Sequence, residues 1–123
     1  MQILYVAIGG AIGAMSRYLI GVAMANSGNS ILTSTTLVNL IGCFVMGILF
    51  EAFRNNIASN DLKIFIGVGI LGAFTTFSAF SQEAIVLIEK RYLLNSIGYI
   101  SLNLLGSLLA VFLGIILVKN VIK

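Results

Sequence analysis

Four long apolar stretches dominate this chain of 123 residues, at residues 3–25, 31–53, 64–88 and 93–118. A helix rises about 1.5 Å per residue, so a helix over any of these stretches would exceed the roughly 30 Å thickness of a membrane's hydrocarbon core. In lipid, backbone polar groups find partners only within helices or closed barrels. We therefore predict an all-α integral membrane protein with four transmembrane helices, which form a single domain over residues 1–123.

The composition argues against a soluble domain and against catalytic chemistry. Hydrophobic residues make up 59% of the chain and charged residues 9%, whereas soluble domains carry roughly 25% charged residues. The chain has no histidine, one cysteine and four acidic residues, too few for the usual zinc sites or catalytic triads. Its basic residues form no run of the kind that binds nucleic acid. We expect neither enzymatic activity nor a nucleic-acid partner.

Short connections at residues 26–30, 54–63 and 89–92 make neighbouring helices antiparallel, so both termini lie on one side of the membrane. The basic residues hardly distinguish the two sides. Four lie on the side of the termini and three on the other: Arg54, Lys63, Lys119 and Lys123 against Lys90, Arg91 and Arg17. Either the insertion machinery reads this weak bias, or the chain inserts both ways and two oppositely oriented copies pair as an inverted repeat.

The first stretch places small residues and one arginine at a spacing of four, which puts them on one helix face: Gly9, Gly13, Arg17 and Gly21. Small residues at this spacing let helix backbones approach closely. Arg17 has two interpretations that are compatible with each other. Its side chain extends to the membrane interface, or it contacts a passing ion.

In the second stretch Thr35 and Asn39 lie four residues apart and therefore share a face. A threonine hydroxyl in a membrane helix often bonds to a carbonyl of its own helix. The amide of Asn39 has two donor hydrogens and an acceptor that its own helix cannot satisfy. Asn39 therefore either bonds to another helix or lies on a solute pathway.

The third stretch concentrates glycine and polar residues around its midpoint, Thr76, where a membrane helix should be most apolar. Gly67, Gly69 and Gly72 lead into this cluster, and the chain contains no proline. Such clustering indicates a helix that is broken at mid-membrane, with its freed backbone groups facing protein or an ion. The alternative is an intact, glycine-rich packing helix.

Just beyond this midpoint, Phe77 and Phe80 are three residues apart and are flanked by Ser78 and Ser81. Aromatic residues at this spacing usually face a core or lipid, but the positive edge of a phenylalanine ring can also contact an anion weakly. Glu83 follows, and it lies either in a water-filled vestibule or at the level of the headgroups.

The fourth stretch carries polar residues at every fourth position, at Asn95, Tyr99, Asn103 and Ser107. Gly106, Ala110 and Gly114 form a second series with the same spacing. The first series indicates a wet face and the second a packing seam. Hydrogen bonds between helices alone could also explain Asn103.

Motifs in all four stretches match one known family in order and spacing. They are Gly13-Ala-Met-Ser-Arg17-Tyr, Thr36-Leu-Val-Asn39-Leu-Ile-Gly42, Gly69-Ile-Leu-Gly72-Ala-Phe-Thr75-Thr-Phe77-Ser-Ala-Phe80-Ser and Gly98-Tyr99 through Gly106-Ser107. With these motifs the chain resembles the Fluc (CrcB) family of fluoride channels. The third motif is specific to that family, whereas the first two alone would be weak.

The resemblance implies an antiparallel, dual-topology homodimer with two fluoride pathways and a structural sodium ion at its centre. The backbone carbonyls of Gly72 and Thr75 would bind the sodium, two from each subunit. Fluoride would contact Asn39, Phe77 and Phe80, with hydroxyl donors at Ser78, Ser81 and Thr35. Less closely matched pathway or vestibule positions are Arg17, Glu83, Tyr99, Asn103 and Ser107. Two positions depart from the family pattern: Ala73 replaces a glycine beside the sodium, and Ala79 replaces a common hydroxyl residue.

The implied function is passive export of fluoride from the cytoplasm through a channel in the inner or plasma membrane, which lowers fluoride toxicity. The residues themselves suit a small hydrated anion, because several weak donors can replace water without trapping the ion. Two alternatives remain. One is a small multidrug-type proton-coupled exporter, which needs a carboxylate at mid-membrane, and the other is a membrane assembly subunit that transports nothing.

Overall fold

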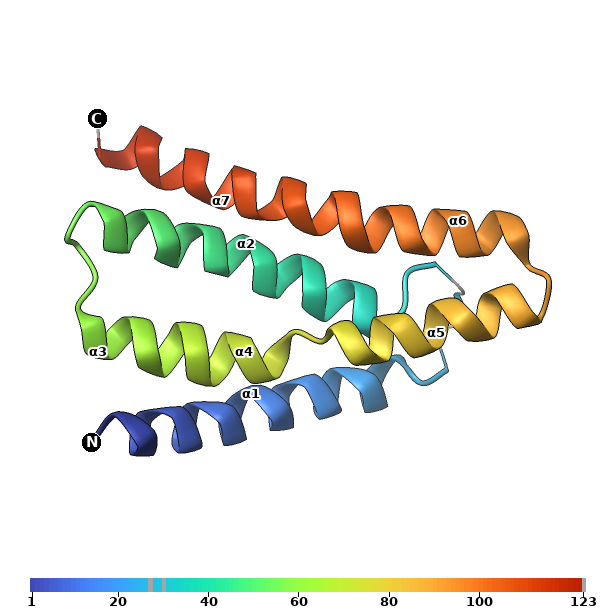
Figure 1. Ribbon diagram of the computed structural model, residues 1–123, viewed down its shortest axis with the longest axis horizontal. Coiled ribbons are helices and arrows are strands. Elements are labelled where there is room, and N and C mark those ends of the chain that lie inside the picture. The colour runs from blue at the N-terminus through green and yellow to red at the C-terminus, as the bar shows by residue number, and fades with distance from the viewer. Residues whose placement is uncertain (27, 30, 123) are drawn as a thin grey trace.

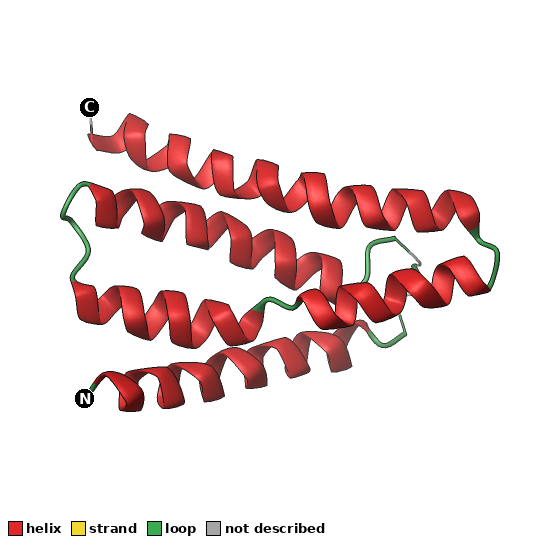
Figure 2. Ribbon diagram, in the orientation of Figure 1, coloured by secondary structure: helices red, strands yellow, loops and turns green. Residues whose placement is uncertain are grey.

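The computed structural model describes residues 1–26, 28–29 and 31–122, and over these ranges it consists of helices and loops (Figures 1 and 2). Four helical segments are long and apolar enough to cross a membrane: Gln2–Met24, Ser34–Arg54, Asn60–Glu89 and Leu93–Ile122. The predicted all-α membrane protein with four spans is confirmed. Ser27 and Ser30 of the predicted first connection, and Lys123 of the charge comparison, lie outside the described residues.

Each crossing is built from one or more helical elements. The first is α1 (Gln2–Met24) and the second is α2 (Ser34–Arg54). The third comprises α3 (Asn60–Leu62), the π-helical η1 (Lys63–Leu71), α4 (Gly72–Phe74) and α5 (Phe77–Glu89). The fourth comprises α6 (Leu93–Ser101), the π-helical η2 (Leu102–Gly106) and α7 (Ser107–Ile122).

Most of these boundaries differ by one or more residues from the predicted ones, and the third crossing begins at Asn60 and not at residue 64. The second helix begins at Ser34 and not at residue 31, because the side chain of Thr33 accepts a hydrogen bond from the N–H of Thr36 at 3.2 Å and caps the helix. The fourth crossing continues to Ile122, beyond the predicted residue 118. Hydropathy alone did not mark this end, because Lys119 and Asn120 extend the helix past its most apolar part.

Glycine seams bring the crossings together in pairs. In Figure 1, α1 lies along the third crossing and α7 lies along α2. A Cβ atom at Gly13 would overlap the backbone carbonyl of Ile70 in η1, and one at Gly114 would overlap the carbonyl of Phe44 in α2. Both glycines are therefore needed for close backbone approach. Both ends of the chain lie at one end of the bundle, as an even number of crossings requires (Figure 1).

The outer surface of the bundle is apolar. Along the fourth crossing, Leu94, Leu105 and Leu108 are exposed by 82%, 67% and 69%. On α1, Ile3 is exposed by 86% and Leu19 by 64%. Exposure of this much apolar surface to water would be unfavourable, whereas contact with lipid chains is not. The protein is therefore a multi-pass membrane protein.

The third crossing is interrupted between α4 and α5. Thr75 (φ −79°, ψ 156°) and Thr76 (φ −151°, ψ 125°) have extended backbone conformations, and Figure 2 shows this short non-helical link between two helices. Thr76 also caps α5, because its hydroxyl accepts a hydrogen bond from the N–H of Ala79 at 3.2 Å. Non-helical backbone at membrane depth must lie against protein or a water-filled cavity, and Thr76 is only 8% exposed.

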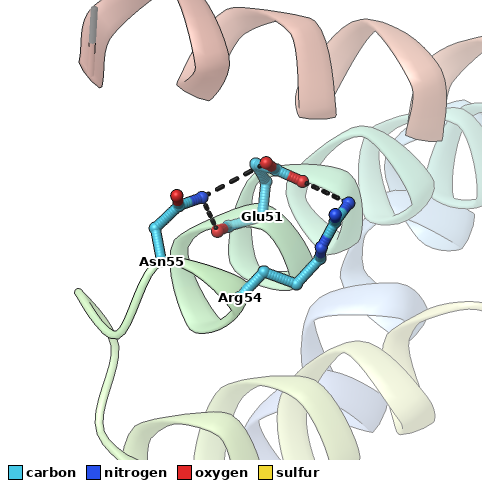
Figure 3. Close-up of polar contacts among 3 residues, drawn as sticks. All are labelled: Glu51, Arg54 and Asn55. Carbon is cyan, nitrogen blue, oxygen red and sulfur yellow. Dashed lines mark hydrogen bonds and ion pairs between the residues drawn. The ribbon is translucent and has the colours of Figure 1, made fainter.

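A buried carboxylate closes the end of α2 (Figure 3). Glu51 is 4% exposed and forms an ion pair with Arg54 at 3.2 Å. The side-chain amide of Asn55 donates to the backbone carbonyl of Glu51 at 2.8 Å and to its carboxylate at 3.2 Å. The cluster neutralises the buried charge, and the Asn55 amide adds a second donor to a carbonyl that already accepts the backbone N–H of Asn55.

Candidate functional site

The centre of the site is a pairing between a side-chain amide on α2 and the backbone of the interruption. The Oδ1 atom of Asn39 accepts the N–H of Thr76 at 2.8 Å, and its Nδ2 atom donates to the carbonyl of Thr76 at 3.1 Å. Nδ2 also donates to Oδ1 of Asn103 at 3.2 Å. Both donor hydrogens and the acceptor of this buried amide thus have partners within the protein.

A second layer of hydrogen bonds supports Asn103. Its Nδ2 atom donates to the hydroxyl of Thr36 at 3.0 Å and to the carbonyl of Tyr99 at 3.1 Å. The Thr36 hydroxyl in turn donates to the carbonyl of Ile31 at 2.9 Å. Asn103 is 4% exposed and Thr36 is fully buried. A connected network of this kind, with every polar atom satisfied, fixes its side chains in place.

The interruption releases two backbone carbonyls from helical hydrogen bonding. In a continuous α-helix the carbonyl of Gly72 would receive the N–H of Thr76, and the carbonyl of Thr75 would receive the N–H of Ala79. The Thr76 N–H goes to Asn39 and the Ala79 N–H goes to the Thr76 hydroxyl. These two carbonyls therefore lose their usual donors to side chains.

Carbonyl oxygens are hard ligands that suit alkali and alkaline-earth cations. Among the described residues there is no group of three or more His, Cys, Asp or Glu side chains that could hold a metal, so a cation here would depend on backbone oxygens. A Cβ atom added at Gly72 would meet nothing closer than 3.6 Å. The donor set at Gly72 and Thr75 thus fits the sodium ion that the resemblance implies.

A carboxylate surrounded by hydroxyls lies beside this centre. Glu83 on α5 accepts hydrogen bonds from Thr33 at 3.0 Å, from Tyr99 at 2.8 Å and from Thr35. These donors come from the start of α2 and from α6, so Glu83 joins three crossings. Bonds to an ionised carboxylate are the stronger kind of hydrogen bond. Three of them replace part of the water that this half-buried carboxylate loses.

The two phenylalanines of α5 differ sharply in burial. Phe77 is 71% exposed, whereas Phe80 is 7% exposed. Their ring centroids are 5.2 Å apart with an interplanar angle of 58°. Phe80 also stacks on Tyr99, with ring centroids 5.7 Å apart. Phe80 is thus held by packing on both sides, and Phe77 presents its ring to the outside of the single chain.

Two cavities meet at Thr76, which lines both of them. The first, of about 350 Å³, is lined by five of the predicted pathway or vestibule residues. They are Asn39, Phe77, Phe80, Asn103 and Ser107, and the predicted sodium ligand Thr75 and the free cysteine Cys43 line it too. The second, of about 400 Å³, lies against Arg17, Thr35 and Ala79. The residues that hold the interruption therefore separate two hollows.

Two predicted hydroxyl donors take local partners. The Ser81 hydroxyl donates to the carbonyl of Phe77 at 2.9 Å, and Ser78 pairs with the Thr76 hydroxyl at 3.2 Å. Ser81 thus makes the bond to its own helix that is common for serine in membrane helices. Neither serine lines either cavity, whereas Ser107 lines the first.

Three residues of the site lie outside the predicted set. Thr33 and Thr36 complete the hydrogen bonds around Glu83 and Asn103, and Gly42 gives the interruption room to approach α2. A Cβ atom at Gly42 would overlap Cγ2 of Thr75 and lie 3.2 Å from a ring carbon of Phe74. Thr36 and Gly42 belong to one quoted motif with Asn39, and their spacing from it was the available signal.

The chain matches a family model described as CrcB-like protein, Camphor Resistance (CrcB), over residues 4–115. The chain belongs to the CrcB family. Relatives from Shewanella piezotolerans and Shewanella woodyi are 41% and 44% identical to it, and each match covers 92% of both chains. A relative from Shewanella putrefaciens is 44% identical over the same share. All three are named fluoride-specific ion channel FluC. The predicted resemblance to the CrcB family is confirmed.

Proposed function

We propose that this protein is a fluoride-selective channel that lets fluoride leave the cytoplasm passively, and that it is not an enzyme. The observation that carries this proposal is the similarity, over nearly the whole chain, to relatives named fluoride-specific ion channels. Neither alternative has such support. A proton-coupled exporter needs a mid-membrane carboxylate free to exchange its proton for a substrate, whereas Glu83 is engaged by three hydroxyls.

The chemistry of the first cavity suits a dehydrated anion. Fluoride moving past Phe77 and Phe80 would meet ring edges, which carry partial positive charge, and then hydroxyl and amide donors at Ser107 and Asn39. Contact with Asn39 would require its amide to exchange one of its two acceptors for the ion. Weak donors in series favour entry and still permit exit, which conduction requires.

We further propose that two copies of opposite orientation pair across the interruption. The exposed ring of Phe77 and the cavity beside it would then face the partner and form part of a closed pathway. The carbonyls of Gly72 and Thr75 from both copies would surround one sodium ion near the two-fold axis. That ion would supply positive charge to carbonyls that hydrocarbon cannot satisfy.

The proposed location is the inner or plasma membrane of the cell. Hydrogen fluoride enters an acidified cell uncharged and dissociates inside, and a negative-inside potential then drives the anion outward. A passive channel is sufficient for this task. Deletion of the gene should therefore reduce growth in fluoride at mildly acidic pH in a cell without a second exporter.

Liposomes that contain the purified protein test the proposal directly. Loaded with potassium fluoride, they should release fluoride rapidly when a potassium ionophore is added, and liposomes loaded with chloride should retain it. Phe77→Ala should slow fluoride release, and Phe112→Ala, a change of an exposed phenylalanine on α7, should not. Vesicles that retain both anions would overturn the proposal, and release driven only by a proton gradient would favour the exporter.

A further inference from the structure

Asn39 holds the interruption by an unusual exchange of partners. Its Oδ1 atom takes the Thr76 N–H that would otherwise close onto the Gly72 carbonyl, and its Nδ2 atom occupies the Thr76 carbonyl. One side chain thus occupies both backbone hydrogen-bonding groups of one residue, Thr76. If the Asn39 amide were rotated by 180°, its Nδ2 atom would face the Thr76 N–H and its Oδ1 atom would face the Thr76 carbonyl. Two donors and two acceptors would then oppose each other, so the backbone of Thr76 permits only one orientation of Asn39.

The orientation of Asn39 determines the donor and acceptor directions at Asn103 and Thr36. Because Nδ2 of Asn39 is a donor, Asn103 must present its oxygen to it. Nδ2 of Asn103 then faces Thr36 and Tyr99, and the hydroxyl of Thr36, which accepts from Asn103, donates to Ile31. Apart from the bond of Asn39 to the Thr76 carbonyl, the donors point away from the interruption and end at the backbone carbonyls of Tyr99 and Ile31. We call this one-way series, Asn39, Asn103 and Thr36, the amide relay.

We propose that Asn103 is a positioning residue that acts through Asn39. The amide relay keeps the backbone N–H and carbonyl of Thr76 out of helical hydrogen bonding and so holds Thr75 and Thr76 extended. Without the oxygen of Asn103, the second hydrogen of the Asn39 amide loses its acceptor, and the amide is held less firmly against Thr76. The N–H of Thr76 is then free to return to the Gly72 carbonyl. The effect that we expect on fluoride flux depends on the proposed function, whereas the effect on the backbone does not.

This role differs from direct contact of Asn103 with the ion. A donor to a passing anion would have an N–H directed into the cavity, but both N–H groups of Asn103 have protein acceptors and the residue is 4% exposed. Its oxygen faces Asn39 and would repel an anion. Asn103 lines the first cavity, but its hydrogen-bonding groups engage Asn39, Thr36 and Tyr99 and are not directed into the cavity.

Amide exchange at Thr76 tests the relay independently of transport. The chain has five threonines, so ¹⁵N-threonine labelling gives few backbone signals, from Thr33, Thr35, Thr36, Thr75 and Thr76. In Asn103→Leu we expect the Thr76 N–H to exchange at least about tenfold faster than in the natural protein. In Asn103→Asp a carboxylate oxygen still accepts from Asn39, so most of the protection should remain. Asn120→Leu, a change of an exposed residue on α7, is the control and should change nothing.

Flux measurements on the same variants complete the test. Asn103→Leu should reduce fluoride release about as much as Asn39→Leu, and the double variant should be no slower than either single one, because both changes break one relay. Should Asn103→Leu fail to fold, Thr36→Val removes only the outer hydroxyl and should weaken Thr76 protection by a smaller factor.

Three outcomes would overturn the proposal. The first is slower flux in Asn103→Leu with unchanged exchange at Thr76, which would mean that Asn103 acts on the ion directly. The second is equal loss of protection in the Asp and Leu variants, and the third is additive loss of flux in the double variant. If the natural protein released no fluoride at all, the proposed function would fail while the exchange results still decided the relay.

Discussion

Asn39 and Thr76 lie 37 residues apart in the chain, and their pairing joins α2 to the interruption of the third crossing through bonds of 2.8 and 3.1 Å. The backbone N–H and carbonyl of Thr76 belong to a buried residue, which is 8% exposed. An unsatisfied polar group in such a setting costs more free energy than the hydrogen bond itself contributes. The stability of the whole centre should therefore depend on one side chain.

We expect Asn39→Leu to lower the free energy of unfolding in detergent by about 2–4 kcal/mol, because it leaves the N–H and the carbonyl of Thr76 buried without Asn39. Asn120→Leu, at an exposed site on α7, should change it by less than about 0.5 kcal/mol. Thermal or denaturant unfolding followed by circular dichroism measures both. Equal stability of the two variants would contradict the pairing.

The approach of the interruption to α2 depends on the absence of a side chain at Gly42. A methyl group there would overlap Cγ2 of Thr75, whose β-branched side chain has little freedom to move. Gly42→Ala should therefore destabilise the protein by about 1–3 kcal/mol and reduce fluoride release. The matched control is Gly10→Ala, since a Cβ at Gly10 would meet nothing within 4 Å. This control should be neutral or slightly stabilising, by up to about 1 kcal/mol.

The sequence predicted the crossings well because length and hydropathy determine them almost alone. The bounds of the third stretch also put its midpoint at Thr76, where glycine and polar residues cluster. The exact ends of the helices were harder to predict. The start of α2 depends on the cap at Thr33, and four consecutive hydroxyl residues at 33–36 left the capping residue undecided in the sequence.

Contacts between distant segments could not be predicted in the same way. The sequence left Asn39 undecided between another helix and a pathway, and the bond to Thr76 depends on how two crossings align. The shared helical spacing of Phe77 and Phe80 also gave no sign that one ring is exposed and the other buried. Glu83 was placed in a vestibule or at the headgroups, but its three hydroxyl partners became visible only in the folded chain.

The hydroxyl of Tyr99 is one of these three partners, and its removal should be measurable. Tyr99→Phe keeps the ring that stacks on Phe80 but deletes the 2.8 Å bond to Glu83. We expect a loss of about 1.5–3 kcal/mol in unfolding free energy, the range for hydrogen bonds to charged groups. Tyr92→Phe is the control, because Tyr92 is 56% exposed. Indistinguishable unfolding curves for the two variants would rule out a structural role for the Tyr99 hydroxyl.

Substitutions at Phe77 and Phe80 should affect fluoride transport and folding stability differently. Phe80 is packed between Phe77 and Tyr99 and is 7% exposed, so Phe80→Ala should cost about 3–5 kcal/mol of stability. Phe77 is 71% exposed within the chain, so Phe77→Ala should leave the fold of the single chain intact. Loss of its ring edge should slow fluoride release about threefold to tenfold, as expected for an interaction of about 0.5–1.5 kcal/mol. Phe77→Leu keeps the bulk but not the ring, so normal release in this variant would show that Phe77 only fills space.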